Sequence, residues 1–169
     1  LCLVQVCFGD DIAHLLQLSK QPEEKPKNLI KLLKNKSITK IFHYGRFDLA
    51  MLHKNICTVI GPIYCTKIAS KLSRTFGAKH GLKDLCKDLL NIELDKFNQT
   101  SDWGTKKLSK DQLAYAAQDV LFLHKLKIKL DEILLREGKM NLALECFESL
   151  KTRVKLDLEG FQELDIFAH

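Results

Sequence analysis

The order of apolar and polar residues predicts a chain in which strands and helices alternate. Short, mostly apolar runs are typical of strands covered on both sides, whereas apolar residues spaced three and four apart indicate amphipathic helices. Strands are expected at residues 3–8, 13–18, 40–43 and 63–65. Helices are expected from residue 28 over the next two turns and at residues 47–54, 66–74, 81–90, about 109–136 and about 140–150, with an irregular connector over 91–104. This order indicates an α/β fold, a mixed sheet flanked by helices.

Turn and capping residues mark several boundaries of these elements. Gly9-Asp10-Asp11 predicts a hairpin turn between the first two strands, so we read these acids as turn residues. Ser109, followed three residues later by Gln112, predicts the start of the long helix, and Glu137-Gly138-Lys139 predicts its end. We find no internal repeat or domain boundary, so residues 1–169 are interpreted as a single domain.

Composition excludes several classes of protein. At 169 residues with 46% hydrophobic content, the chain can form one core, and no apolar run approaches the roughly 20 residues needed to cross a bilayer. The six cysteines show neither the spacing of a zinc site nor a disulfide framework. We therefore predict a reduced, cytoplasmic protein that does not bind membranes, and we infer no obligate protein partner.

The net charge of +6 and the pI near 9.0 favour an anionic partner such as nucleic acid. An AT-rich coding sequence would also produce an excess of lysine, and this alternative stays open. Lys79, Lys83 and Lys87 can flank a phosphate track, or they can form the solvated side of a helix.

One pair of residues suggests a specific chemistry. Tyr115 and Asp119 are four positions apart, so on a helix they share one face. A carboxylate that binds a metal, beside a phenol that holds the attacking water, is a combination that suits a metal-dependent phosphodiesterase. The alternative is a packed ring next to a solvated acid.

The residues around this pair resemble a known family. Residues 101–123 (SDWGTKKLSKDQLAYAAQDVLFL) are similar to the third exonuclease motif of the ribonuclease D family, which belongs to the DEDD 3′–5′ exonucleases with tyrosine in that motif. Residues 40–49 resemble the second motif, and 64–69 with 80–85 fit the segment between the two. Residues 161–169 resemble the end of short bacterial ribonuclease D-like proteins, so the resemblance covers essentially the whole chain.

The resemblance implies a ribonuclease H-like fold and a set of site residues. It implies two divalent metal ions, Mg²⁺ or Mn²⁺, with Asp48 and Asp119 as ligands and Tyr115 positioning the attacking water. Four further residues are candidates for contact with nucleic acid: His43, Phe47, Lys83 and Trp103. Two of them have structural alternatives, because His43 can be a strand-end residue and Trp103 can fill a hydrophobic gap.

The first motif of the family is Asp-x-Glu on a central strand that precedes the segment at residues 1–8, and this sequence has no such motif before that segment. Residues 1–8 look like the second strand of the family fold, so we expect a gap in the sheet and interpret the chain as an exonuclease domain truncated at its N-terminus. The predicted function is metal-dependent 3′–5′ exoribonuclease activity in RNA or tRNA 3′ processing, weak or absent in this chain by itself. The alternatives are a non-catalytic remnant that keeps some nucleic-acid binding and a DNA 3′–5′ exonuclease.

Overall fold

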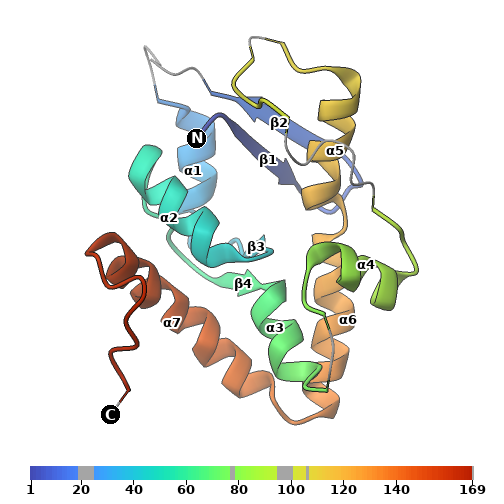
Figure 1. Cartoon of the computed structure of the whole chain (residues 1–169), viewed down its shortest axis with the longest axis vertical. Helices are drawn as coiled ribbons and strands as arrows, with labels where there is room; N and C mark the ends of the chain where they lie inside the picture. The colour runs from blue at the N-terminus through green and yellow to red at the C-terminus, as the bar shows by residue number, and fades with distance from the viewer. Residues whose placement is uncertain (19–24, 77–78, 95–100, 106, 169) are drawn as a thin grey trace.

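Two separate pairs of strands, each covered by helices, form the framework of the fold (Figure 1). The structure is a computed structural model that describes residues 1–168 except 19–24, 77–78, 95–100 and 106. The strands are β1 (Leu3–Cys7), β2 (Ala13–Gln17), β3 (Lys40–Phe42) and β4 (Ile63–Cys65). The helices are α1 (Lys27–Lys34), α2 (Gly45–Asn55), α3 (Thr66–Ser73), α4 (Leu82–Leu90), α5 (Lys110–Leu121), α6 (Leu123–Arg136) and α7 (Met140–Leu158).

Strands β1 and β2 form the predicted hairpin. They pair antiparallel, with Leu3 opposite Gln17 and Cys7 opposite Ala13. The turn uses Gly9 at φ +86°, a conformation that glycine adopts without steric cost. The carboxylate of Asp10 accepts a hydrogen bond from the backbone N–H of Ile12 at 3.2 Å, so this acid is used by the turn itself.

Strands β3 and β4 form a parallel pair connected through α2. Lys40 lies opposite Ile63 and Phe42 opposite Cys65. In the part of the chain that the structure describes, β1–β2 and β3–β4 are two sheets with no backbone pairing between them. The expected mixed α/β arrangement is therefore present, in the form of two small sheets.

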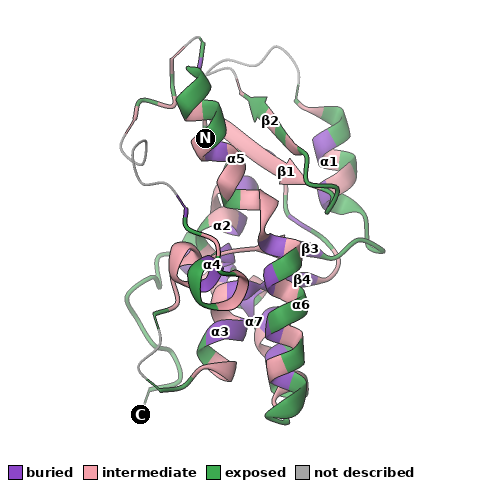
Figure 2. Ribbon diagram, turned by 90° about the vertical axis from the view of Figure 1, so that its right-hand side faces the viewer, coloured by how far each residue is buried: buried purple, intermediate pink, exposed green. Residues whose placement is uncertain are grey.

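The main core lies where α2, α3, α6 and α7 surround the β3–β4 pair. Figure 2 shows buried residues concentrated on the inward faces of these helices. Ala69, Leu130, Leu134 and Phe147 are fully or almost fully buried there. A smaller cluster joins α4 to α6 through Leu85, Cys86, Leu94 and Leu126.

The prediction of one long helix over residues 109–136 was wrong in one respect. The helix is divided at Phe122, where φ is −100° and ψ is −4°, into α5 and α6. Helix α5 packs against β1 and β2, whereas α6 packs against α3 and α4. A single straight helix would not make both sets of contacts. Phe122 packs against the cluster between α4 and α6. Because the break contains no glycine or proline, the sequence gives no local signal for it.

The prediction that the last helix ends near residue 150 was also wrong, because α7 continues to Leu158. Its added turns bury Val154 and bring Asp157 to the arginines Arg46 and Arg153. Asp157 is only 7% exposed and accepts hydrogen bonds from Arg46 Nε at 2.5 Å and from Arg153 Nε at 3.0 Å. The start of α2 is thereby fixed to the end of α7.

A search of the described residues finds no helix that combines the length and the hydrophobicity needed to cross a membrane.

We expect Asp157→Asn to lower the free energy of unfolding by about 2 kcal/mol, since it leaves two arginines at the buried position of Asp157 without their shared counter-charge. Urea unfolding at neutral pH measures this loss. Glu132→Gln is the matched control, because its ion pair with Lys129 is exposed and such pairs contribute about 0–1 kcal/mol. Equal effects of the two substitutions would contradict a special role for Asp157.

Candidate active site

Asp48 lies in the first turn of α2, directly after β3. Tyr44, the residue before the helix, adopts a left-handed conformation with φ +63°, and its carbonyl accepts a hydrogen bond from Phe47 N–H at 3.1 Å. This sharp turn from strand into helix sets the direction of the first helical turn. The Asp48 side chain is half-buried as a result.

Tyr115 and Asp119 lie one helical turn apart on α5, as the sequence predicted. The start of this helix is fixed by a capping box: Ser109 accepts from Gln112 N–H at 3.1 Å, and the Gln112 side chain accepts from Ser109 N–H at 2.8 Å. Packing of α5 on the β1–β2 hairpin buries Ala116 completely.

Asp48 and Asp119 are brought close enough to repel each other, although they are on different helices and far apart in sequence. Burial raises the pKa of Asp48 from its usual 3.8 to about 7, and the negative charge of Asp119 adds to this shift. Asp119 remains accessible to solvent, but neighbouring protein atoms remove part of its hydration and raise its pKa as well. A pair of carboxylates of this kind favours binding of a cation or a shared proton.

Tyr115 and Trp103 pack against each other beside this pair. Their ring centroids are 6.0 Å apart with the planes inclined by 35°. The pKa of Tyr115 is raised by burial and then by the charge of Asp119, so the phenol is protonated at neutral pH. Gln112 also donates from its side chain to the Asp102 carbonyl at 3.1 Å, which connects the Trp103 loop to α5. Trp103 is half-buried and limits the positions that the Tyr115 ring can adopt.

His43 follows β3 and hydrogen-bonds through Nδ1 to the Thr66 hydroxyl at 2.9 Å. Because the Thr66 hydroxyl donates to the Phe42 carbonyl at 3.2 Å, His43 Nδ1 must be the donor, and Nε2 is left as an acceptor. Burial, together with the positive charge of Lys67, lowers the pKa of His43 to about 4, so the ring is neutral at pH 7.

Thr66 was not among the residues singled out from the sequence, although a signal for it existed. The carboxyl ends of two neighbouring parallel strands meet at one edge of a sheet, and the sequence indicated strands that end near His43 and Cys65. Thr66 follows Cys65 directly, so a parallel β3–β4 pair would have placed it beside His43.

The other two candidates for nucleic-acid contact differ in their surroundings. Phe47 precedes Asp48 and is 59% exposed, so its ring is available at the surface next to the pair of acids. Lys83 lies on α4, and its charge acts on Glu93 at the end of that helix. Among the described groups, the charge that acts on Asp48 is that of Asp119, not of Lys83. The structure therefore brings together Asp48, Asp119, Tyr115 and Trp103.

The donor set suits a hard divalent cation but is incomplete. Carboxylate oxygens are the ligands that Mg²⁺ and Mn²⁺ prefer. Within the described ranges, however, no group of three or more acidic, histidine or cysteine side chains could hold a metal ion. Asp48 and Asp119 can supply part of the coordination of a cation, and further oxygen ligands are needed to hold it firmly.

Comparison with known proteins gives a consistent result. The 3′–5′ exonuclease family matches residues 1–135. The structure of Brucella melitensis NrnC is 51% identical, covers 99% of this chain and 81% of its own, and superposes with a TM-score of 0.94. Further structures of that protein are described as bound to pGG and with bound Mg²⁺.

Ribonuclease D proteins are more distant relatives. The Escherichia coli enzyme, described as an exoribonuclease involved in structured RNA processing, is 25% identical with a TM-score of 0.78 over 90% of this chain and 40% of its own. Ribonuclease D of Acidiphilium cryptum is 32% identical over 86% of this chain and 36% of its own length. The chain thus spans about a third of the curated relatives that it matches.

The fold is the ribonuclease H-like fold of these exonucleases, whose chemistry depends on divalent metal ions. From the match over residues 1–135 and the two groups of relatives, the chain belongs to the 3′–5′ exonuclease family and is an exonuclease domain of the ribonuclease D type.

Proposed function

We propose that this domain acts in the hydrolytic removal of nucleotides from the 3′ end of RNA, with Asp48 and Asp119 as metal ligands and Tyr115 positioning the attacking water. The observation that carries this proposal is that α2 and α5 bring together two partly desolvated carboxylates: burial and then the charge of Asp119 raise the pKa of Asp48 to about 7, and burial raises the pKa of Asp119. Two divalent ions, Mg²⁺ or Mn²⁺, bound at this position would neutralise the charge of the phosphate and activate the attacking water.

The side chains of the domain have separate tasks in this proposal. Asp48 and Asp119 must be ionised to bind a cation, and the positive charge of a bound cation would counteract the burial and the charge of Asp119, which together raise the pKa of Asp48. Tyr115 stays protonated and can donate a hydrogen bond to the water or to a phosphate oxygen. Trp103 restricts the Tyr115 ring, and the neutral His43 offers an acceptor at Nε2.

RNA is the proposed substrate because the curated relatives are named ribonuclease D. The pGG-bound structure of the Brucella protein supports a short strand as a ligand. DNA is the other candidate substrate, since the carboxylates act on the phosphodiester and not on the sugar. A cytoplasmic location is also proposed, because all six cysteines are free thiols, as in proteins of reducing compartments.

The chain by itself is proposed to have little activity, because two carboxylates hold a metal pair weakly. The test is Mn²⁺-dependent degradation of a 5′-labelled RNA by this chain and by a version that carries an added Asp-x-Glu strand of the family. Activity in the added-strand version alone supports the proposal. Activity in neither version favours a non-catalytic remnant, and equal activity in both means that other residues complete the site.

Asp48→Asn and Asp119→Asn are each expected to reduce Mn²⁺-dependent trimming by the added-strand version at least about 100-fold, because a metal ligand is lost. Asp111→Asn is the matched control: this acid is exposed in the first turn of the same helix as Asp119. Rates near that of the parent for either ligand variant would refute the assignment of that residue.

Tyr115→Phe is expected to lower the turnover number about 10- to 100-fold with little change in KM, because a group that orients the nucleophile is lost while the ring still packs on Trp103. Tyr64→Phe provides the control, since it removes the hydroxyl group of a tyrosine that lies in the core. If the Tyr115 variant is as fast as the parent, the phenol does not position water.

Metal-free protein is expected to show a pH dependence that comes from Asp48. Its pKa is raised from 3.8 to about 7 in the folded state, so the contribution of this residue is neutral below about pH 4, becomes increasingly destabilising between about pH 4 and 7, and is constant at higher pH. In chelator at pH 8, Asp48→Asn should therefore exceed the parent in free energy of unfolding by about 2 kcal/mol, and at pH 4 the two should be equal. Urea unfolding at both pH values measures this, and a difference that does not change with pH would contradict the buried-pair interpretation.

A further inference from the structure

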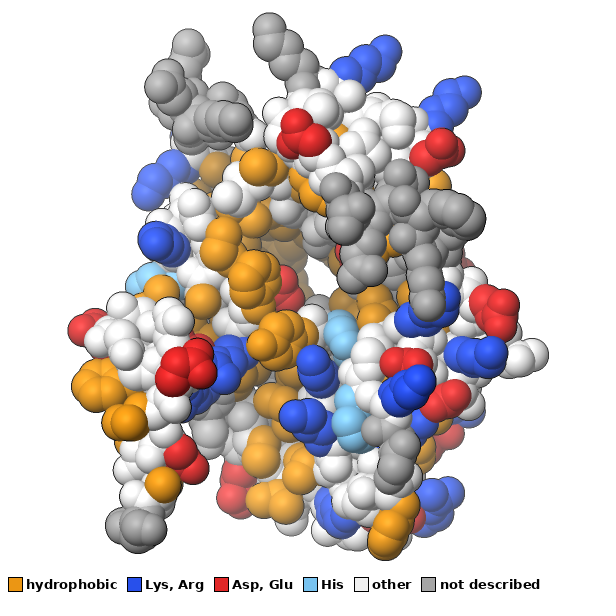
Figure 3. Space-filling model, in the orientation of Figure 1, with side chains coloured by type: hydrophobic (Ala, Val, Ile, Leu, Met, Phe, Trp, Pro, Cys, Tyr) orange, Lys and Arg blue, Asp and Glu red, His pale blue; other side chains and the backbone are white. Residues whose placement is uncertain are grey.

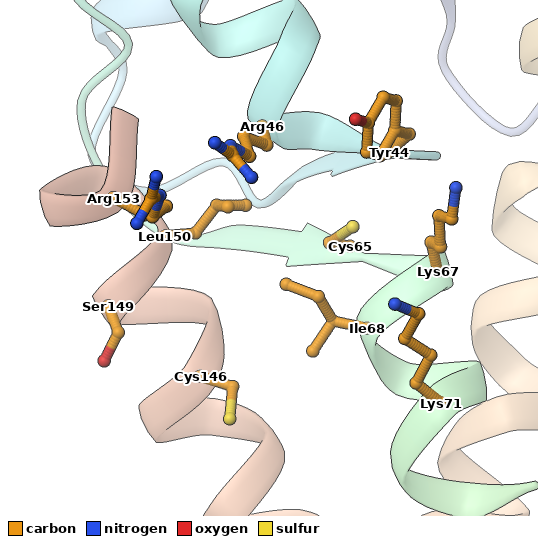
Figure 4. A pocket seen from close by; sticks show the side chains of 10 residues that line it. All are labelled: Tyr44, Arg46, Cys65, Lys67, Ile68, Lys71, Cys146, Ser149, Leu150 and Arg153. Carbon is orange, nitrogen blue, oxygen red and sulfur yellow. The ribbon is translucent and has the colours of Figure 1, made fainter. Parts of the chain in front are cut away.

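A pocket of about 540 Å³ lies between the start of α2, the end of β4, and helices α3 and α7 (Figure 4). Four of its lining side chains are cationic: Arg46, Lys67, Lys71 and Arg153. The other lining residues are neutral, and none is an aspartate or glutamate. Figure 4 shows the two arginines on one side of the pocket and the two lysines on the other. A cavity with cations on two walls is suited to an anionic group.

The arginine wall is held in place by bonds to the protein itself. Asp157 accepts from both arginines, and the backbone of the tail after α7 accepts from them as well: Arg46 donates to the Gln162 carbonyl at 3.0 Å, and Arg153 donates to the Phe161 carbonyl at 2.7 Å. Arg46 uses Nε and Nη2 in its described bonds, which leaves its Nη1 hydrogens for a ligand. This guanidinium is therefore oriented before any ligand binds.

On the lysine side of the pocket, the described residues include no carboxylate that neutralises the positive charge as Asp157 does for the arginines. Lys67 and Lys71 are four residues apart on α3 and thus share one face. The Lys67 ammonium lies 4.2 Å from the centre of the Tyr44 ring, and within the described part of the chain neither lysine forms an ion pair with a carboxylate. The positive charge of Lys67 also acts on His43 at the end of β3. Figure 3 shows Lys and Arg side chains gathered near the middle of this face.

Tyr44 connects this pocket to the candidate active site. It lines the pocket, is 49% exposed, and directly precedes α2, whose first turn carries Asp48. An exposed ring beside cations is the combination that binds single-stranded nucleic acid, because bases stack on aromatic faces while lysine and arginine neutralise phosphates.

We propose that the pocket between α2, α3 and α7 binds a backbone phosphate of the nucleic-acid strand whose 3′ end lies at Asp48 and Asp119, with a base stacked on Tyr44. Arg46 supplies a pre-oriented donor through Nη1, Lys67 and Lys71 neutralise the phosphate from the opposite wall, and Arg153 adds positive charge on the side of Arg46. The nature of the strand rests on the proposed function, whereas the binding of phosphate does not.

Binding is tested in the full chain without metal, so that the result is independent of hydrolysis. The probe is a short fluorescently labelled single-stranded RNA in chelator, followed by anisotropy between about 50 and 200 mM KCl. Lys67→Gln/Lys71→Gln is expected to weaken binding about tenfold and to reduce the slope of log affinity against log salt by about 0.7, since the two lysines neutralise one phosphate and each phosphate contact on a single strand contributes about that amount. The matched control is Lys31→Gln/Lys36→Gln, which removes the same charge from exposed positions outside the pocket.

The outcomes separate this proposal from its alternatives. A control variant that loses as much affinity as the pocket variant would mean that only net charge matters and would overturn the proposal. So would displacement of the RNA by AMP or inorganic phosphate at concentrations similar to those of unlabelled RNA, since the pocket would then bind a free phosphate group and not a strand. Tyr44→Ala, with Tyr44→Phe as its control, is expected to weaken RNA binding and to leave the weak competition by inorganic phosphate unchanged.

A failure of the proposed catalytic function gives a different result. In that case Asp48→Asn and Asp119→Asn leave Mn²⁺-dependent trimming unaltered, while the metal-free binding of the pocket variant still differs from that of its control. If the pocket proposal alone is wrong, trimming depends on the two acids and the lysine substitutions do not change RNA affinity.

Discussion

Two carboxylates that repel each other, Asp48 and Asp119, are held together in this fold by helices that pack on different sheets. Burial and then the charge of Asp119 raise the pKa of Asp48, so the ionised pair is unfavourable without a cation. The position of Asp48 depends on the turn from β3 into α2, and that of Asp119 depends on the contact of α5 with the β1–β2 hairpin. The hydrophobic packing on both sides therefore has to offset a local electrostatic cost.

The two halves of the site are joined by contacts far from it. Helix α6 packs against α3 and α4, and the division at Phe122 lets α5 turn away to the hairpin while the main core remains intact. Asp157 fixes the start of α2 to the end of α7 through Arg46. The direction of each acid-bearing helix is thus set at its end or at a break, where a small change in angle alters the separation of the carboxylates.

Positive charge is distributed around this acidic pair in a way that suits a polyanionic ligand. Two carboxylates repel a phosphate diester unless cations neutralise the negative charges of the carboxylates and of the phosphate. A surface that binds nucleic acid therefore needs positive groups outside the acidic centre. The cations of the pocket beside Tyr44 lie at such a position: Arg46 is on α2, the helix that also carries Asp48, whereas the two lysines are on α3 and Arg153 is on α7. Net charge alone, which an AT-rich coding sequence could also produce, would not have located this surface.

The sequence by itself determined most of the local structure. The Gly9-Asp10-Asp11 turn, the Ser109 cap, the end of α6 at Gly138 and the Tyr115–Asp119 face all follow from spacing and from residue chemistry over a few positions. The motifs around Asp48 and Asp119 also indicated the family, because they are short and specific. These features depend on residues that are close in sequence, and a linear pattern records them directly.

Tertiary structure alone decided the features that depend on packing between distant segments. The division at Phe122 follows from two helix-packing directions, and the last turns of α7 follow from Arg46, which is more than one hundred residues away. The contact of Trp103 with Tyr115 and the grouping of Arg46 with Lys67 likewise join residues that no sequence spacing relates. The free energy of each such contact belongs to the folded arrangement of several elements, so it leaves no periodic signal in any one of them.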